Sequence, residues 1–252
     1  RRQQKLAKKA ARKKNASSSG GDLIEPPSAE VQQLLDTAVQ HHTAGRLPEA
    51  EKLYDQVLQV SPTQPVALHL RGVVFLQMGK IDLAVELISK AIASKPDYAD
   101  AHANLGNALR KQGKMDEAVG SFKNAISVNP DHVDALSNLG NVLRDLNRYE
   151  EAIDSYRRAL IIKPDFADGH FNLGNTFKKL EMFDEAASSY SRSLAIKPEN
   201  AEAFNNLGNV LQSQGKFNEA LSCFEKAIAI KPDHTMARIN LGSALREVGR
   251  FD

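Results

Sequence analysis

Apolar and polar residues follow one another from residue 31 onward with the spacing of paired amphipathic helices, and the pattern repeats every 34 residues. Within each unit, positions 4, 7, 8 and 11 are mostly apolar or small, which is the i, i+3, i+4, i+7 spacing of one helical face. Positions 20, 24, 27 and 28 repeat this spacing, so each unit predicts two helices. The units are 31–64, 65–98, 99–132, 133–166, 167–200 and 201–234, followed by a partial unit, 235–252.

Small and large residues within a unit indicate how its two helices meet. Gly at position 8 and Ala at position 20 allow the helices to approach closely. A large residue at position 24 then fills the space beside them. The residues at position 24 are Tyr54, Ile88, Phe122, Tyr156, Tyr190 and Phe224.

The limits of each helix are also marked in the sequence. Residues that suit a left-handed C-cap follow the first helix; they are Gly45, Gly79, Gly113, Asn147, Gly215 and Gly249. Glu181 departs from this pattern and predicts a slightly strained turn. Candidate N-caps of the second helix are Asp82, Asp116, Asp184 and Asn218. A proline at position 32 ends each second helix, because it has no N–H to donate.

This pattern of 34 residues, with Leu-Gly, then Ala, then a large ring, then Pro, resembles the tetratricopeptide repeat. The resemblance covers residues 31–252. It departs at position 4, which varies, and in the first unit, where Thr37–Ala38 replaces Leu-Gly. We therefore expect an all-α, right-handed superhelical solenoid of helix–turn–helix units, six complete and one partial, because short helix pairs bury their apolar faces only by stacking.

The motif NLGN recurs in the predicted first helices, which line the concave groove in the tetratricopeptide family. That resemblance places positions 2, 5, 6, 9, 12 and 13 in the groove. Position 6 gives Asn104, Asn138, Asn172, Asn206 and Asn240, and position 9 gives Asn107, Asn141, Asn175 and Asn209. An Asn amide offers two donors and an acceptor, so it can pair with the backbone of an extended peptide. The alternative is that these side chains bridge neighbouring helices.

Charged residues suggest two further rows along the groove. Position 2 is acidic in four successive units, at Asp100, Asp134, Asp168 and Glu202. Position 12 is mostly basic, at Arg110, Arg144, Lys178 and Arg246. Both rows could instead be solvated charges. The lysines of the related family's carboxylate clamp are absent from position 5, so we do not expect binding of chaperone tails.

The repeated NLGN cores, the KPD joints and the run IDSYRRALIIKPDFADGHFNLGN at 153–175 resemble the repeat arm of the O-linked N-acetylglucosamine transferase group. In that group an asparagine row holds protein substrates. Related bacterial repeat proteins look similar. We predict a protein–protein interaction scaffold that binds an extended peptide. The alternative is a non-catalytic, substrate-presenting arm of a larger glycosyltransferase.

Residues 1–30 differ from the repeats in composition and charge. Eight basic residues and no acidic residue lie in 1–14, and 15–30 are rich in Ser, Gly and Pro, which predicts a basic tail and a flexible linker. The tail could bind an anionic partner weakly, or it could be a solvated leader. The repeats are close to neutral, and the whole chain has a net charge of +2.

Residues with catalytic or metal-binding chemistry are few. The sequence contains no P-loop, G-x-S-x-G, H-E-x-x-H or C-x-x-C motif, so we expect no catalytic residue, metal or cofactor. His41 and His42 point in different directions on a helix, and His102 and His170 occupy the packing position 4. The single cysteine, Cys223, indicates no disulfide. No apolar run is long enough for a membrane span, and we expect a cytoplasmic protein.

The chain begins at Arg1 and ends inside a repeat, at Asp252. We therefore expect it to be a fragment of a longer protein. A last unit without its second helix should leave an apolar edge exposed, and this predicts fraying or self-association at the C-terminal edge.

Overall fold

The computed structural model describes residues 28–249, which form thirteen α-helices and no strand. Each complete unit contributes one pair of helices, and α14 follows the six pairs. The helices are α2 (Ala29–Thr43), α3 (Leu47–Val60), α4 (Pro65–Gln77), α5 (Ile81–Ser94), α6 (Ala99–Lys111), α7 (Met115–Val128), α8 (Val133–Asp145), α9 (Tyr149–Ile162), α10 (Ala167–Lys179), α11 (Phe183–Ile196), α12 (Ala201–Ser213), α13 (Phe217–Ile230) and α14 (Thr235–Glu247).

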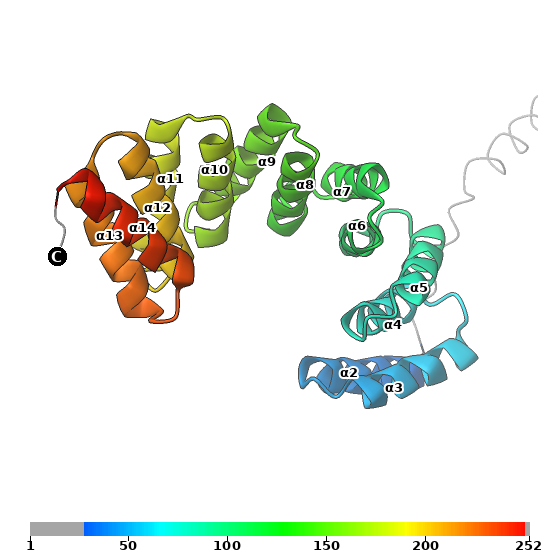
Figure 1. Ribbon diagram of the computed structural model, residues 1–252. Helices are drawn as coiled ribbons and strands as arrows, with labels where there is room; N and C mark the ends of the chain where they lie inside the picture. The colour runs from blue at the N-terminus through cyan, green and yellow to red at the C-terminus, as the bar shows by residue number, and fades with distance from the viewer. Residues whose placement is uncertain (1–27, 250–252) are drawn as a thin grey trace, which may run out of the picture.

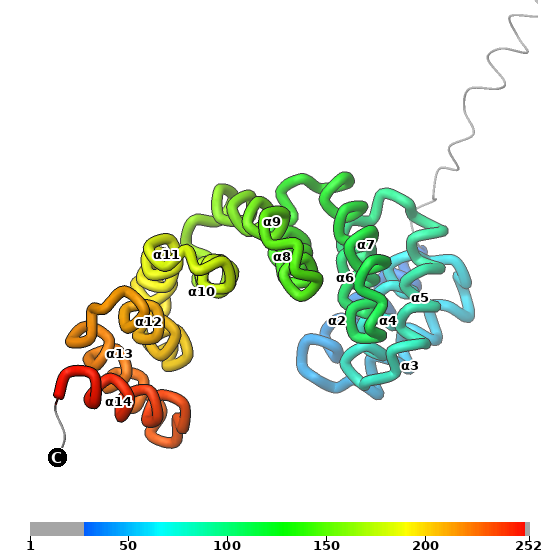
Figure 2. The backbone as a smooth tube through the Cα atoms, turned by 45° about the horizontal axis from the view of Figure 1, so that its top comes forward, coloured from blue at the N-terminus to red at the C-terminus, as the bar shows by residue number. Residues whose placement is uncertain are grey.

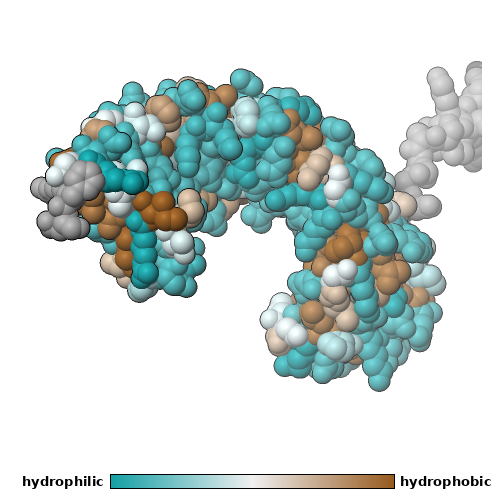
Figure 3. Space-filling model, in the orientation of Figure 1, coloured by the Kyte–Doolittle hydropathy of each residue, from teal (hydrophilic) through white to brown (hydrophobic). Residues whose placement is uncertain are grey.

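The pairs stack along an arc, with α2 and α3 at one end and α13 and α14 at the other (Figures 1 and 2). Contacts are strongest within each pair and next strongest between consecutive pairs, while the first helices of neighbouring pairs also touch. In Figure 1, α6 and α8 lie on the inner side of the arc and α7 and α9 on the outer side. The space-filling view shows the molecule hollowed between its two ends (Figure 3). The expected all-α superhelical solenoid is confirmed.

Five of the six pairs are built around a large side chain that packs on a glycine, as the sequence predicts, and in the first pair Ala38 takes the place of the glycine. A Cβ added to Gly106 would lie 2.8 Å from Phe122, and one added to Gly140 would lie 2.6 Å from Tyr156. Both rings are fully buried. The helices are therefore closer here than any larger residue permits.

The turns and helix ends also follow the prediction. The glycines between the helices have positive φ, as do Asn147 (58°) and Glu181 (56°). Glu181 therefore occupies the left-handed backbone region, which residues other than Gly and Asn rarely adopt. Every second helix ends two residues before its proline, for example at Val60 before Pro62.

The predicted N-caps of the second helices are wrong. Asp82, Asp116, Asp184 and Asn218 are each the second residue of a helix, and the N-cap positions hold Lys80, Lys114, Met182 and Lys216, without side-chain caps. The reason is that the left-handed turn residue is followed by only one residue before the helix begins. The acidic side chains instead lie in the first turn, where negative charge is favourable.

Two of these carboxylates join neighbouring repeats. Gln112 Nε2 donates a hydrogen bond to Asp82 Oδ1 at 2.6 Å, and Gln214 Nε2 donates to Asp184 Oδ1 at 2.7 Å. Each glutamine follows the first helix of one unit, and each aspartate is the second residue of the second helix in the unit before it. The same connection therefore occurs at two interfaces of the solenoid.

The two ends of the repeat array complete the description. α2 begins at Ala29, capped by the Ser28 hydroxyl, so the predicted linker to residue 30 overlaps its first turn. The basic tail lies outside the described residues, as do residues 250–252. At the other end, α14 exposes Met236 and Ile239, and the predicted self-association there stays a prediction. Over the described residues, no helix combines the length and apolar character that a membrane span needs.

Candidate binding groove

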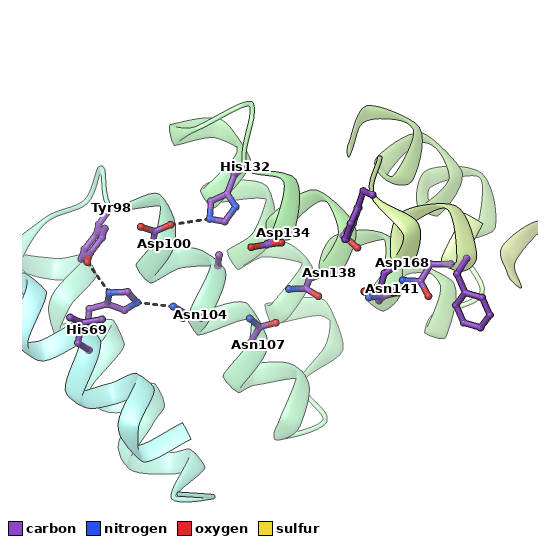
Figure 4. A pocket seen from close by; sticks show the side chains of 16 residues that line it. His69, Tyr98, Asp100, Asn104, Asn107, His132, Asp134, Asn138, Asn141 and Asp168 are labelled. Carbon is purple, nitrogen blue, oxygen red and sulfur yellow. Dashed lines mark hydrogen bonds and ion pairs between the residues drawn. The ribbon is translucent and has the colours of Figure 1, made fainter. Parts of the chain in front are cut away.

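The inner side of the arc contains an open pocket of about 640 Å³ formed by the units that begin with α4, α6, α8 and α10 (Figure 4). Its lining comes from positions 2, 5, 6 and 9 of the repeat and from position 34, which immediately precedes each first helix. Because the same positions recur in stacked units, residues 34 apart in the chain lie along one surface. We call this surface the central groove.

Seven of the predicted site residues line the central groove. They are Asn104, Asn107, Asn138, Asn141, Asn172, Asp134 and Asp168. The other seven are not among its lining residues: Asn175, Asn206, Asn209, Asn240, Arg110, Arg144 and Lys178. Only part of the predicted row of asparagines therefore lies in the central groove.

The position-6 asparagines differ in what holds their amides. Asn104 Nδ2 lies 2.8 Å from His69 Nε2, and Asn240 Nδ2 donates to Asn205 Oδ1 at 2.9 Å. In both cases the partner stands 35 residues earlier, at position 5 of the preceding unit. The corresponding residue is Ala103 before Asn138 and Ser137 before Asn172. Among the described residues, the side chains of Asn138 and Asn172 form no hydrogen bond, so their amides are available in the groove.

The position-9 asparagines fall into two groups as well. Tyr156 and Tyr190 donate their hydroxyl protons to Asn141 Oδ1 and Asn175 Oδ1, both at 2.8 Å. These two amides therefore bridge the helices of one pair, as the alternative interpretation proposed. In the units of Asn107 and Asn209, phenylalanine replaces the tyrosine. The amides of Asn107 and Asn209 make no hydrogen bond to a described residue.

Asn206 belongs to a closed network outside the central groove. Its Nδ2 donates to Asn175 Oδ1 at 3.2 Å, and its Oδ1 accepts a hydrogen bond from Lys178 Nζ at 3.3 Å. Asn206 is 8% exposed, and burial lowers the pKa of Lys178. Both the nitrogen and the oxygen of its amide are therefore hydrogen-bonded to protein, which makes a structural role the simpler interpretation for this copy of the motif.

A buried imidazole lies at the α4 end of the groove. His69 is 3% exposed, and its Nδ1 lies 2.9 Å from Tyr98 Oη (Figure 4). Burial lowers the pKa of His69 to about 4, although Asp100 opposes this effect and His42 adds to it. Burial, followed by the charge of Asp100, raises the pKa of Tyr98 to about 12. Both groups are neutral near pH 7.

Carboxylates of position 2 form the polar rim of the groove. Asp100 Oδ1 lies 3.2 Å from His132 Nε2, while His132 Nδ1 accepts a hydrogen bond from Ala135 N and so caps α8. Since Nδ1 accepts, the proton of a neutral His132 is on Nε2, which faces Asp100. Asp134 and Asp168 continue the row along the groove. No described cation is paired with either of them.

The predicted basic row is placed differently from the acidic one. Arg110 lies 3.8 Å from Asp145, in the next unit, and Arg144 lies 3.4 Å from the same carboxylate. Position 12 lies six residues, or about one and two-thirds helical turns, beyond the groove residues of position 6, and these side chains reach neighbouring helix ends. None of the described basic residues of position 12 is among the residues that line the central groove.

Sequence reasoning missed the residues of position 34. Tyr98, His132 and Phe166 line the groove from the joints between units. These positions could have been recognised because each is an aromatic or imidazole ring in the segment between two units, which otherwise consists of Pro, Asp and small polar residues. Because the resemblance assigned the groove to first helices only, the residue preceding each helix was not considered.

Other candidate residues have structural surroundings. His102 Nε2 and His170 Nε2 each lie 2.9 Å from the carbonyl oxygen of the proline six residues earlier, so both stabilise joints. Cys223 is buried, and burial raises the pKa of its thiol, which disfavours the reactive thiolate. Over residues 28–249, no group of three or more His, Cys, Asp or Glu side chains could hold a metal ion.

Comparison with protein families supports the repeat assignment. A family model described as "TPR repeat" matches residues 72–113, 140–181 and 179–215. Two further models are described as "Tetratricopeptide repeat". One matches residues 99–132 and 201–234, and the other matches residues 121–154. Together the matches extend from residue 72 to residue 234. The boundaries 99–132 and 201–234 coincide with two of the units predicted from the sequence.

Curated relatives and solved structures agree with this result. The chain is 31% identical over 80 residues to a tetratricopeptide repeat and J domain-containing co-chaperone of Fusarium oxysporum, and 33% identical over 61 residues to human tetratricopeptide repeat protein 13. These stretches cover 32% and 24% of this chain but only 15% and 7% of the relatives.

The structure is similar to YrrB, described as a repeat protein with an unusual peptide-binding site, with a TM-score of 0.64 and 23% identity over 74% of this chain and 96% of that one. It also resembles PilF of Pseudomonas aeruginosa, with a TM-score of 0.76 and 18% identity over 84% and 97% of the two chains. At these identities the likeness shows the fold.

Proposed function

The chain is a tetratricopeptide repeat protein, and we propose that it is a non-catalytic scaffold that binds an extended segment of another protein in the central groove. One observation carries this proposal: Asn107, Asn138 and Asn172 line the groove with amides that form no hydrogen bond to described residues. Polar groups held at a surface without protein partners are suited to binding a ligand. YrrB, which shares the fold, is itself described as having a peptide-binding site.

The chemistry of the lining favours a peptide backbone as the ligand. Each free amide can donate to a carbonyl and accept from an N–H, whatever side chains the peptide carries. Each hydrogen bond contributes about 0.5–1.5 kcal/mol net. Several such bonds, together with apolar contacts to Phe166 and Phe171, correspond to roughly micromolar affinity.

The charge of the groove adds a preference. Asp100, Asp134 and Asp168 line it, and none of the described lysines or arginines does. Opposite charges across an interface favour the correct partner and speed association. We therefore propose segments that carry Lys or Arg beside the asparagine-bound backbone.

The proposal is tested by selecting 12-residue peptides from a random display library and measuring their affinities by titration calorimetry. Replacing Asn138 and Asn172 together with Ala should weaken binding tenfold or more and leave helical circular dichroism unchanged. Asn209→Ala is the matched control, because it removes a free amide outside the groove, and its affinity should change less than twofold. Failure to select any peptide, or equal loss in both variants, would contradict the proposal.

The alternative, in which the repeats are the arm of a larger glycosyltransferase, would use the same groove and stays a prediction from the repeat resemblance. It differs in what the bound segment is for. A scaffold holds its partner, whereas an arm presents it to a catalytic domain. The groove experiment applies equally to both.

A further inference from the structure

We propose that His69 and Tyr156 are positioning residues that orient Asn104 and Asn141 in opposite senses, so that the central groove requires a ligand N–H at Asn104 and a ligand C=O at Asn141. This inference rests on the proposed peptide-binding function. It adds a fixed pattern of donor and acceptor to a row of side chains that could otherwise bind a backbone in either orientation.

The orientation of Asn104 follows from the chemistry of its partner. An amide Nδ2 only donates, so His69 Nε2, 2.8 Å away, must accept. The ring proton of neutral His69 is then on Nδ1, which donates to Tyr98 Oη at 2.9 Å. This arrangement directs Asn104 Nδ2 toward α4. It leaves Asn104 Oδ1 as an acceptor with no described partner, on a residue that lines the groove.

Asn141 is held in the reverse sense. The Tyr156 hydroxyl donates to Asn141 Oδ1 at 2.8 Å, so the oxygen end of this amide faces the helix pair. The two N–H groups of Asn141 Nδ2 have no partner among the described residues, and Asn141 lines the groove. This residue therefore offers donors, and a peptide carbonyl is the group that it binds.

The residues between these two amides have no such constraint. The residue 15 positions after Asn107 is Phe122, which has no hydroxyl, and the residue 35 positions before Asn138 is Ala103, whose side chain cannot accept a hydrogen bond. Their amides can rotate to suit the ligand. The groove thus combines a fixed acceptor at Asn104 and a fixed donor at Asn141 with amides between them that can rotate. Only the fixed pair selects the hydrogen-bonding pattern of the ligand.

The test uses Tyr156→Phe and His69→Phe, with Tyr190→Phe as the matched control. The control removes the same hydroxyl-to-asparagine bond outside the central groove. Phenylalanine already occupies position 24 at Phe122 and position 5 at Phe171, so these changes suit the repeat. Affinity for the selected peptide should fall threefold or more in both groove variants and less than twofold in Tyr190→Phe. Equal effects in all three variants would overturn the inference.

A second measurement uses the same peptide with each backbone amide replaced in turn by an ester, which removes one N–H. In the wild-type protein one replacement should weaken binding fivefold or more, because it deletes the partner of Asn104 Oδ1. In His69→Phe the same replacement should cost less than twofold. An unchanged ester profile in the variant would show that His69 does not orient Asn104.

A third measurement needs no ligand and keeps failure of the inference separate from failure of the proposed function. Nitrogen-15 NMR of the free protein should show His69 with its proton on Nδ1 and a bare Nε2. A proton on Nε2 would overturn the inference even if peptides bind. If no peptide is selected while His69 shows the expected tautomer, the proposed function fails and, because it rests on that function, the ligand requirement fails with it.

Discussion

The central groove and the C-terminal repeats contain the same NLGN motif but use it differently. Between α6 and α10, Asn107, Asn138 and Asn172 have free amides and line the pocket. Between α10 and α14, Asn175 and Asn206 bond to each other, and Asn240 bonds to Asn205. In the central groove these three amides form no hydrogen bond to a described residue. In the C-terminal repeats Asn175, Asn206 and Asn240 join neighbouring units, and Asn209 is the exception with an amide that no described residue holds.

The difference lies in residues outside the motif. The residue 35 positions earlier holds the Nδ2 of Asn104 and of Asn240, through His69 and Asn205. The Nδ2 of Asn206 is held instead by Asn175, 31 positions earlier. The residue 15 positions after a position-9 asparagine determines whether its Oδ1 is held, as Tyr156 and Tyr190 show. A repeat unit therefore cannot be assigned a role from its own first helix.

The largest expected difference between the regions is produced by acid. The pKa of folded His69 is about 4, below its ordinary value of 6.5, so the unfolded chain binds a proton first as the pH falls. The contribution of neutral His69 to the free energy of unfolding is therefore fully present above pH 6.5 and is lost as the pH falls toward 4. The loss is about 1.4 kcal/mol per pH unit in this window, or about 3 kcal/mol in all.

Hydrogen exchange at pH 6.5 and pH 4.5 measures this loss locally. The opening free energy of α4 and α6 should decrease more than that of α12 and α14, where Asn205 takes the place of the imidazole and does not titrate. The groups facing His69 are Asp100, His42 and Tyr98. His69→Phe should remove the excess loss, and a variant with an unchanged acid profile would contradict the assignment.

The next comparison concerns glycine at position 8. In Gly140→Ala the new Cβ would lie 2.6 Å from the buried Tyr156 ring, and such overpacking typically costs about 1–3 kcal/mol. In Gly242→Ala the new Cβ would meet no described side chain within 4 Å, so the variant should gain about 0.5–1 kcal/mol from better helix propensity. Urea denaturation compares the two, and effects of the same sign would contradict the packing described.

A smaller effect is expected where an amide is structural. Asn206→Ala removes the acceptor of Lys178 Nζ and the donor to Asn175, and should lower the free energy of unfolding by about 1 kcal/mol. Asn138→Ala, which removes an amide without a described protein partner, should change it by less than about 0.5 kcal/mol. Peptide affinity should respond in the opposite order. Equal destabilisation would mean that Asn138 is also structural.

The sequence was sufficient for the fold because the information for it is local and repeated. Helix faces, the positive-φ turns and the prolines are properties of one unit, and each occurs several times. The N-caps were misplaced because the sequence does not reveal that only one residue separates the positive-φ residue from the second helix. Asp82 and its counterparts are residue types that suit an N-cap, but they lie inside the first turn.

The site was only partly predictable. Acidic position 2 and the asparagines of positions 6 and 9 were found, because the family resemblance places first helices in the groove. Position 34 was missed, and the division of the asparagine row was not foreseen. That division depends on contacts between units, such as His69 with Asn104, which no single repeat reveals.

The smallest expected effect comes from a contact that both regions share. Gln112 and Gln214 each donate to an aspartate of the preceding unit, and each keeps a buried Oε1 without a described partner. Leu occupies the same repeat position at residues 146 and 180. In Gln112→Leu and Gln214→Leu, loss of the hydrogen bond is therefore offset by relief of the unpaired oxygen.

Both glutamine variants should change the free energy of unfolding by less than about 0.5 kcal/mol, and by equal amounts. Calorimetric unfolding of the two proteins under identical conditions measures this. The equality matters more than the size, because it tests whether the two regions share the same repeat architecture beneath their different asparagines. A large loss of stability in one variant alone would show that the two interfaces between repeats differ in packing. The difference between bonded and unbonded asparagine amides would then follow from that packing and not only from the neighbouring side chains.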